Sequence, residues 1–232
     1  MSKVKHLRTQ MIPREKALGW LYFLLELFVL PTVLHMLNDA LPRPLPEAVL
    51  NFIFFCLNFV VILLIFHRYL LKSLESAGKK FWNFFQATLL GFVTYWVCSF
   101  ALGYLILLLK PDFANINDAG IAAMADSHFM LMAVGTVILV PVVEECFYRG
   151  LIFRNLYGKS RWAAYIVSIL AFAIIHIVGY IGKYSALELL MAVLQYLPAG
   201  LCLAWSYTKA DTIFAPILIH GAVNFITIHG LR

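Results

Sequence analysis

Residues 81–109 read FWNFFQATLLGFVTYWVCSFALGYLILLL, a run of 29 residues without Asp, Glu, Lys or Arg. A membrane-spanning helix needs about 20 consecutive apolar residues. The run therefore predicts a helix that crosses a lipid bilayer and is long enough to tilt, kink or protrude. It decides the fold class, because a stretch this apolar has no place on the surface of a soluble domain.

The rest of the chain repeats this pattern. Hydrophobic residues make up 62% of the 232 residues and charged residues 13%, whereas soluble domains are typically about 45–50% apolar and about 25% charged. These figures exclude a soluble, disordered or fibrous protein. We predict an all-α polytopic membrane helical bundle with about seven, or between six and eight, transmembrane helices, in a single integral-membrane domain spanning residues 1–232. Besides residues 81–109, the predicted spans are Ala17–Leu37, Ala48–Phe66, Phe129–Tyr157, Trp162–Ile181, Leu187–Tyr207 and Thr212–Ile228.

The distribution of Lys and Arg predicts how the spans are oriented. With an inside N-terminus, 13 of these residues fall on the inner side, with Arg154 at the inner end of its span counted among them, 4 fall on the outer side, and Arg149 is left within a span. Cytoplasmic loops carry such an excess of positive charge. Residues 1–16 then form a basic cytoplasmic segment, and the C-terminus lies outside if the spans number seven. The bilayer explains the net charge of +6, so we expect no nucleic-acid partner.

Charged residues inside a span are candidates for function. Residues 141–150 read PVVEECFYRG, and two Glu and one Arg facing lipid would cost on the order of 8–10 kcal/mol. Glu145 and Arg149 are four residues apart on one helix face and can pair. Glu144 points about 100° away from Glu145, so it does not share the pairing with Arg149 and is the acid available for chemistry. The alternative is an ion-pair cluster that only fixes helix packing.

Two later spans carry further polar residues. His176 lies in one, and His220 and Asn224, stacked on one helix face, lie in the other; each alone can be a hydrogen-bonded packing residue. Counted at 1.5 Å per residue from the inner ends of the spans, Glu144 lies at about 20 Å, His176 at about 21 Å, and His220 and Asn224 at about 12 and 18 Å. The residues therefore share one level of the bilayer, which favours a common site.

Several other residues near this depth of the bilayer are weaker candidates for a role in the site. Pro141 and Pro216 precede Glu144 and His220 and are expected to bend their helices and open a water-accessible cavity. Glu26 is either a cavity or gating residue or an interfacial acid. Four more side chains are expected near span ends: His35, His128, Glu188 and His229.

At these residues the chain resembles the CAAX protease and bacteriocin-processing (CPBP, or Abi) family of intramembrane proteases. The family motifs EExxxR, FxxxH and HxxxN read here Glu144 to Arg149, Phe172 to His176, and His220 to Asn224. Each motif alone is weak, but three in this order, with Arg149-Gly150 and Pro216-Ile217-Leu218-Ile219-His220 as flanks, are fairly specific. The resemblance implies a catalytic core over residues 129–228.

The resemblance also implies roles. Glu144 and His176 would activate water, His220 and Asn224 would donate to the oxyanion, and Glu145 with Arg149 would orient the motif helix. A different interpretation of the family makes Glu144, His176 and His220 ligands of a divalent metal such as zinc. The cofactor stays open; we favour metal-independent chemistry because an amide such as Asn224 is a poor zinc ligand and a good oxyanion donor.

The expected function is an intramembrane endopeptidase in a bacterial cell membrane. Its partners would be the lipid bilayer and a membrane-bound peptide or small protein, such as a bacteriocin or signalling peptide. One alternative is a non-catalytic bacteriocin self-immunity protein. A proton-coupled transporter is less favoured, because the chain lacks the inverted repeat that many carriers show.

Overall fold

The computed structural model describes residues 7–230, and within that range every regular element is a helix. The all-α prediction is therefore confirmed. The α-helices are α1 Pro13–Phe28, α2 Leu30–Asp39, α3 Glu47–Lys79, α4 Phe81–Leu109, α5 Ile116–Val134, α6 Val140–Glu145, α7 Arg154–Tyr157, α8 Arg161–Ile175, α9 Ala186–Ala210 and α10 Phe214–Gly230. Two π-helical segments, η1 Gly135–Leu139 and η2 Cys146–Phe153, join α5 to α6 and α6 to α7, and a short 3₁₀ turn, η3 Val178–Tyr180, follows α8.

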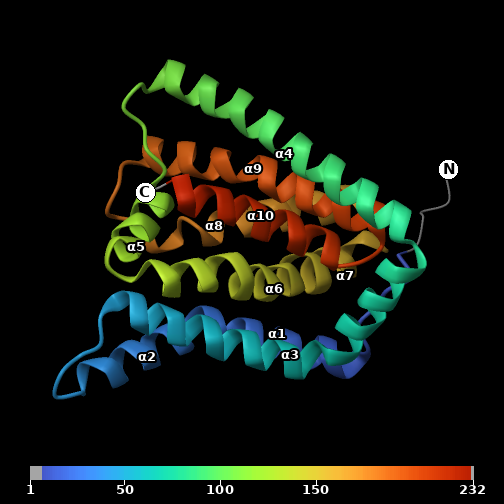
Figure 1. Ribbon diagram of the computed structural model, residues 1–232, viewed down its shortest axis with the longest axis horizontal. Helices are drawn as coiled ribbons and strands as arrows, with labels where there is room; N and C mark the ends of the chain where they lie inside the picture. Colours follow the sequence, from blue (N-terminus) through green and yellow to red (C-terminus); the bar gives the residue numbers. More distant parts are fainter. Residues whose placement is uncertain (1–6, 231–232) are drawn as a thin grey trace.

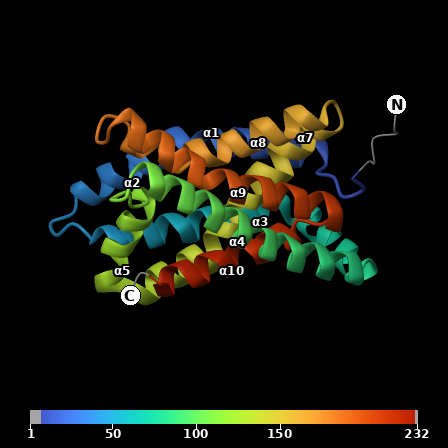
Figure 2. The same ribbon diagram turned by 90° about the horizontal axis from the view of Figure 1, so that it is seen from above.

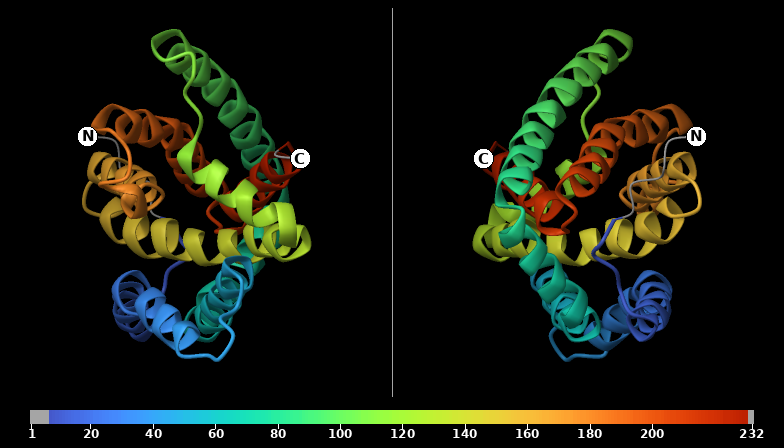
Figure 3. Two further views of the ribbon diagram at one scale, coloured as in Figure 1. Left: turned by 90° about the vertical axis from the view of Figure 1, so that its left-hand side faces the viewer. Right: turned by 90° about the vertical axis from the view of Figure 1, so that its right-hand side faces the viewer.

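The run from α5 to α7 occupies the middle of the bundle. Figure 1 shows it between the α1–α3 segment on one side and α8, α9 and α10 on the other, and the end-on views of Figure 3 agree. Helix α4 packs along α9 and α10, and it crosses the top of the bundle in Figure 1. Because the central run contacts helices on both sides, it is the element best placed to carry a shared site.

The exterior of the bundle is apolar, as a lipid-facing surface requires. Within residues 7–230, four helical stretches are long and apolar enough to cross a membrane: α3, α4, the continuous run Ile116–Tyr157, and α9. The pair α1 and α2, bent by 44°, makes a fifth if it counts as one span, while α8 and α10 are shorter apolar helices. All seven predicted apolar stretches are helical over most of their length, although the fifth ends at Ile175 and not at Ile181, and how many of them cross the membrane stays a prediction.

The segments predicted to face the cytoplasm meet at one end of the bundle. Asp211, in the α9–α10 turn, accepts a hydrogen bond from the Arg8 backbone N–H (2.9 Å) and pairs with Lys80 Nζ (2.7 Å). Arg154 Nη2 donates to the Leu7 carbonyl (2.7 Å). Figures 1 and 2 show α10 ending at the opposite end of the molecule. One end of the bundle thus gathers the N-terminal segment and the basic loops.

Two predicted boundaries coincide with local breaks inside longer helices. The central helical run begins at Ile116, where Asn115 Oδ1 caps α5 by accepting from the backbone N–H groups of Asn117 (3.0 Å) and Asp118 (3.2 Å), and it breaks at His128 (φ −135°, ψ 47°), just before the predicted start at Phe129. A cap of this kind starts a helix regardless of hydropathy. Helix α3 continues past Phe66 to Lys79, with a local break at Phe66 (φ −102°, ψ 18°).

The two prolines that were predicted to bend their helices lie in different surroundings. Pro216 does not bend α10, because it lies in the first turn of that helix, where the missing N–H would have had no partner in any case. Pro141 lies in the first turn of α6, two residues after the end of the π-helical segment η1. A π-helical turn widens the helix and absorbs the bond that proline cannot make, so Pro141 changes the register of the helix that carries Glu144.

Candidate active site

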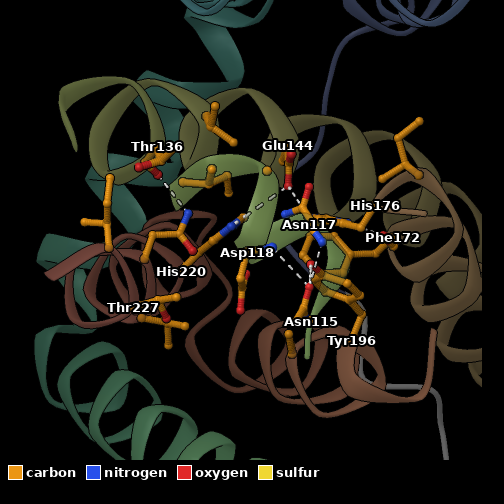
Figure 4. A pocket seen from close by; sticks show the side chains of 18 of the residues that line it. Asn115, Asn117, Asp118, Thr136, Glu144, Phe172, His176, Tyr196, His220 and Thr227 are labelled. Carbon is orange, nitrogen blue, oxygen red and sulfur yellow. Dashed lines mark hydrogen bonds and ion pairs between the residues drawn. The ribbon is translucent and has the colours of Figure 1, made fainter. Parts of the chain in front are cut away.

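Glu144 projects from α6 into a cavity and faces two imidazoles (Figure 4). Its Oε2 lies 3.9 Å from His176 Nε2 and 3.9 Å from His220 Nε2. These distances are too long for direct hydrogen bonds, and Oε2 has no hydrogen-bond partner among the described residues. Three side chains from three helical segments therefore converge on one point without forming direct hydrogen bonds there, so their facing atoms remain free to bind a ligand or water.

His176 lies just beyond the end of α8 and not inside the span as predicted. The helix ends there because the side chain competes with the backbone: His176 Nδ1 donates to the Phe172 carbonyl at 2.6 Å. In a neutral ring this bond leaves the lone pair on Nε2, which faces Glu144. The ring also stacks on Tyr196, with ring centroids 4.2 Å apart. His176 thus presents an acceptor to the cavity in a fixed orientation.

Glu145, next to Glu144 in sequence, is fully buried and bonded on the opposite side. Its Oε1 accepts from Arg149 Nη1 (3.0 Å) and lies 3.0 Å from His220 Nδ1. The ion pair expected from the spacing of Glu145 and Arg149 is present, with both side chains 0% exposed. The contact with His220 was not predicted. Its effect is to hold the imidazole so that Nε2 points at Glu144.

Arg149 connects the central run to α9. Its Nη2 donates to the Gly200 carbonyl at 3.3 Å, and its guanidinium lies 4.4 Å from the centroid of the Phe172 ring. Charge-assisted hydrogen bonds and a cation–π contact in a dry interior are strong interactions. Arg149 is therefore committed to Glu145 and to helix packing, and it does not reach the cavity.

Asn224 is held by the Thr136 carbonyl of η1, which has no hydrogen bond within its own helix. In η1 the Val140 N–H bonds to the Gly135 carbonyl. In the same π-helical register the Thr136 carbonyl would need a donor at position 141, which is proline and has no N–H. Asn224 Nδ2 donates to this carbonyl at 2.8 Å. The second amide hydrogen and the amide oxygen remain available at the cavity, which Asn224 lines.

The cavity has a volume of about 940 Å³, which lies in the range of ligand sites. Glu144, His176, His220 and Asn224 all line it. Their clustering matches the shared depth expected from the sequence. Further lining residues come from α1 to α4, which lie outside the three motifs, and from α5, α9 and α10.

Several lining residues were missed from the sequence. Asn115 Nδ2 donates to Gln195 Oε1 (2.8 Å), and the Tyr196 hydroxyl donates to Asn115 Oδ1 (3.4 Å). Asp118 and Thr136 also line the cavity (Figure 4). The signal that could have found Gln195 and Tyr196 is a polar pair within an apolar helix. No local pattern indicates that Asn115 and Asp118 return to the same cavity.

The weaker candidates separate into two groups. Glu26 lines the cavity from α1, as one of its two predicted interpretations requires, and His35 lines it near Glu47. His128 and His229 bond locally to Ser127 Oγ (2.8 Å) and to the Phe225 carbonyl (2.8 Å), respectively. Glu188 pairs with Lys110 at 2.7 Å, and this hydrogen bond raises the pKa of the Lys110 ammonium.

The arrangement does not form a ready-made zinc site. Ligand atoms at about 2.1 Å from a tetrahedral Zn²⁺ lie about 3.4 Å from one another. Both imidazole Nε2 atoms lie 3.9 Å from Glu144 Oε2. Across residues 7–230, no group of three His, Cys, Asp or Glu side chains has the arrangement that a metal ion needs. The side chains would have to close up before they could hold a metal.

Comparison with known proteins agrees with the motifs. Residues 126–226 match the family model described as Type II CAAX prenyl endopeptidase Rce1-like. The UPF0177 protein YbdI of Lactococcus lactis subsp. lactis is 25% identical over 147 residues, which cover 60% of this chain and 73% of that protein. No solved structure matches the chain. The matched segment contains all three motifs and, at the level of the family, supports an intramembrane endopeptidase.

Proposed function

Because residues 126–226 match the family model of Rce1-like type II CAAX prenyl endopeptidases, we propose that this protein is an intramembrane endopeptidase that cleaves membrane-associated peptides or small proteins. Residues 129–228 form its catalytic core. One observation carries the proposal: the Glu144 carboxylate and the His176 imidazole face each other across 3.9 Å, in a cavity of about 940 Å³ inside an apolar helical bundle.

Glu144 and His176 activate the water that attacks the peptide bond. Glu144 Oε2 and the lone pair of His176 Nε2 are both acceptors, so a water molecule between them donates one O–H to each. As the water attacks the carbonyl carbon, one of these groups takes its proton as a general base, and that proton can later pass to the leaving amine. The geometry that supports this step is the convergence of two acceptors on one point.

His220 and Asn224 stabilise the oxyanion of the tetrahedral intermediate. Asn224 has an amide hydrogen beyond the one bonded to the Thr136 carbonyl. With its Nδ1 directed to Glu145 Oε1, His220 turns Nε2 toward the cavity, and this atom donates in the form of the ring in which both nitrogens carry protons. Donors held in place before the reaction act on the charge that develops in the transition state. Glu145 and Arg149 are positioning residues.

The substrate reaches the site within the membrane. The cavity is lined mostly by apolar side chains, and the exterior of the bundle carries many exposed Leu, Phe, Val and Ile residues. Both features suit a membrane-bound peptide, such as a bacteriocin or signalling peptide. We assign the end that gathers Leu7, Lys80, Arg154 and Asp211 to the cytoplasm of a bacterial cell, following the excess of Lys and Arg there.

Peptide cleavage in reconstituted membranes tests the proposal. Glu144→Gln and His176→Ala are each expected to abolish turnover at equal folded amounts, while Glu75→Gln and His229→Ala, two matched changes outside the cavity, keep wild-type rates. Full cleavage by either site variant would sink the assignment. If wild-type protein cleaves nothing but protects membranes from a bacteriocin, the self-immunity alternative takes its place. Proton flux on substrate addition would instead favour the transporter.

A further inference from the structure

Helix α3 is longer than a bilayer requires and has a break in its second half. Its 33 residues, Glu47–Lys79, extend about 50 Å at 1.5 Å per residue, whereas the hydrocarbon core of a bilayer is about 30 Å thick. The stretch before the break at Phe66 extends about 30 Å. This stretch is long enough to cross the membrane alone, and residues 67–79, here called the surface segment, extend beyond it.

The surface segment lies across the end of the bundle that carries the basic loops. The Tyr69 and Tyr207 hydroxyls hydrogen-bond at 3.0 Å, and Thr212 Oγ1 donates to the Ser73 carbonyl at 2.7 Å. Glu15 Oε1 accepts from the Tyr69 backbone N–H at 2.9 Å, close to the break in the helix. Figure 1 shows this part of α3 rising toward the start of α4. The surface segment is therefore fixed along this end of the bundle.

The side chains of the surface segment form three faces. One face is buried against the bundle and carries Tyr69, Leu70, Ser73 and Ala77. A second face is apolar but open, with Leu71 65% and Leu74 57% exposed. The third face, about 100° further round the helix, is exposed and charged, with Arg68, Lys72, Glu75 and Lys79. A helix with apolar and basic open faces suits a position in the plane of a membrane surface.

The charged face has an excess of positive charge. Glu75 pairs with Lys79 on the same helix. Arg68 and Lys72 have no ion pair with any of residues 7–230. These two residues are four apart, so their side chains are neighbours on the helix surface. A single anionic group can therefore contact both.

The start of α4 is an independent sign of a membrane surface. Phe81 is 60% and Trp82 66% exposed. The Trp82 ring stacks on the rings of Phe81 and Phe85, with centroids 6.4 and 5.6 Å apart. Exposed Trp side chains are enriched at the level of the lipid headgroups. Because these rings follow the surface segment directly in the chain, aromatic and basic side chains meet at one end of the bundle.

We propose that the surface segment lies in the plane of the inner membrane surface, and that Arg68 and Lys72 bind the phosphate groups of anionic phospholipids. Leu71 and Leu74 would then contact the acyl chains. An anionic leaflet attracts Lys and Arg next to a membrane-spanning helix. A lipid fits this surface better than an acidic protein does, because the exposed leucines and Trp82 beside the cations need an apolar environment. The inference does not depend on the peptidase function.

Native mass spectrometry of the full chain in detergent tests the headgroup contact. The probes are phosphatidylglycerol and phosphatidylcholine with the same acyl chains, offered at equal concentration. We expect the wild-type protein to retain phosphatidylglycerol about tenfold more than phosphatidylcholine. Arg68→Gln combined with Lys72→Gln should remove most of this preference. The matched control, Arg14→Gln combined with Lys159→Gln at exposed positions in α1 and the α7–α8 turn, should retain it.

Cysteine labelling tests the position of the helix. Leu74→Cys and Glu75→Cys place a thiol on the apolar and the charged face, respectively, and the wild-type chain with its four native cysteines is the blank. In vesicles made of equal parts phosphatidylcholine and phosphatidylglycerol, a water-soluble maleimide should label Glu75→Cys about tenfold faster than Leu74→Cys, because lipid covers the apolar face.

Two results would overturn the inference. Loss of the phosphatidylglycerol preference to the same extent in both double variants, or its absence in the wild-type protein, would mean that Arg68 and Lys72 form no headgroup site. Equal labelling rates of Leu74→Cys and Glu75→Cys in vesicles would place the surface segment in water, where an acidic soluble partner would be the better occupant.

Discussion

Two adjacent glutamates have opposite environments in this protein. Glu145 is 0% exposed and bonded through one oxygen to both Arg149 and His220, whereas Glu144 is 23% exposed and, among residues 7–230, its nearest polar partners lie 3.9 Å away. The rotation of about 100° between neighbouring helix positions separates them. The Glu145 carboxylate therefore positions its neighbours, and the Glu144 carboxylate keeps a free oxygen that can take part in a reaction.

The first prediction concerns the contribution of the Arg149–Glu145 ion pair to stability. Arg149→Ala should lower stability by about 3–5 kcal/mol, because it leaves the Glu145 charge uncompensated in a dry site. Folded yield and the thermal midpoint in detergent measure the effect. Arg68→Ala, which removes an exposed Arg, is the control. Adding Glu145→Gln to Arg149→Ala should recover part of the loss. A melt of Arg149→Ala equal to wild type would show that the pairing does not support the fold.

Metal dependence makes the second prediction. If Glu144 and His176 activate water without a metal, chelators should leave cleavage unchanged, and elemental analysis should find well under one metal per chain. If a metal activates the water instead, the three side chains must first move closer than their present 3.9 Å separations. Stoichiometric zinc, with activity lost on chelation and regained on adding zinc, would overturn the metal-free mechanism and leave the peptidase assignment intact.

At the scale of elements, irregular helices position the site. The π-helical turn η1 ends at Leu139, two residues before Pro141, and together the π turn and the proline free the Thr136 carbonyl that holds Asn224. Helix α10 comes close enough to η1 for this bond because position 221 is glycine: a Cβ there would lie 2.7 Å from the Val137 carbonyl oxygen. That oxygen belongs to the backbone and cannot swing aside, so the approach of these two elements depends on Gly221.

Gly221 makes the third prediction. Gly221→Ala should push α10 away from η1, lower stability by about 1–3 kcal/mol, and reduce turnover about a hundredfold by displacing His220 and Asn224. The same substitution at Gly230, in the last turn of α10 with nothing within 4 Å of a Cβ, is the control. Turnover and thermal midpoint are measured for both. Wild-type turnover by Gly221→Ala would mean that α10 tolerates the shift without disturbing the site.

At the scale of the whole molecule, Asp211 joins several chain segments at the end of the bundle that carries the basic loops. Asp211 has a left-handed backbone (φ 54°), which Asp and Asn tolerate better than most residues. Its carboxylate holds Arg8 and Lys80, and its carbonyl accepts from Thr9 Oγ1 (2.8 Å) and Ser76 Oγ (3.0 Å). The N-terminal segment, the α3–α4 turn and the α9–α10 turn are thereby joined.

Asp211 makes the fourth prediction. Asp211→Ala should destabilise the fold by about 1–3 kcal/mol, because it leaves buried donors without an acceptor and places a less tolerant residue at a positive φ. Limited proteolysis should then cut faster between residues 7 and 12. Asp211→Asn, which keeps an acceptor oxygen and the backbone tolerance, should have a smaller effect, and exposed Asp126→Ala almost none. Equal protease sensitivity of Asp211→Ala and wild type would contradict this role.

The sequence alone determined the class of fold and the approximate level of the site. Apolar length is a local property, so each predicted stretch became a helix, and helical rise alone brought Glu144, His176, His220 and Asn224 to similar depth. Helix ends were harder to predict, because caps such as Asn115 and His176 act through single hydrogen bonds. The absence of a bend at Pro216 follows from its place in the helix, which apolar length does not reveal.

The tertiary structure decided the partners within the site. The bonds from His220 to Glu145 and from Asn224 to Thr136 join residues 75 and 88 positions apart, and Glu26 and Asp118 reach the cavity from separate helices. Periodicity and hydropathy report only which face of a helix is apolar. Which polar atoms meet depends on how closely the helices approach and on which backbone carbonyls are free, and both are set by packing between segments far apart in the chain.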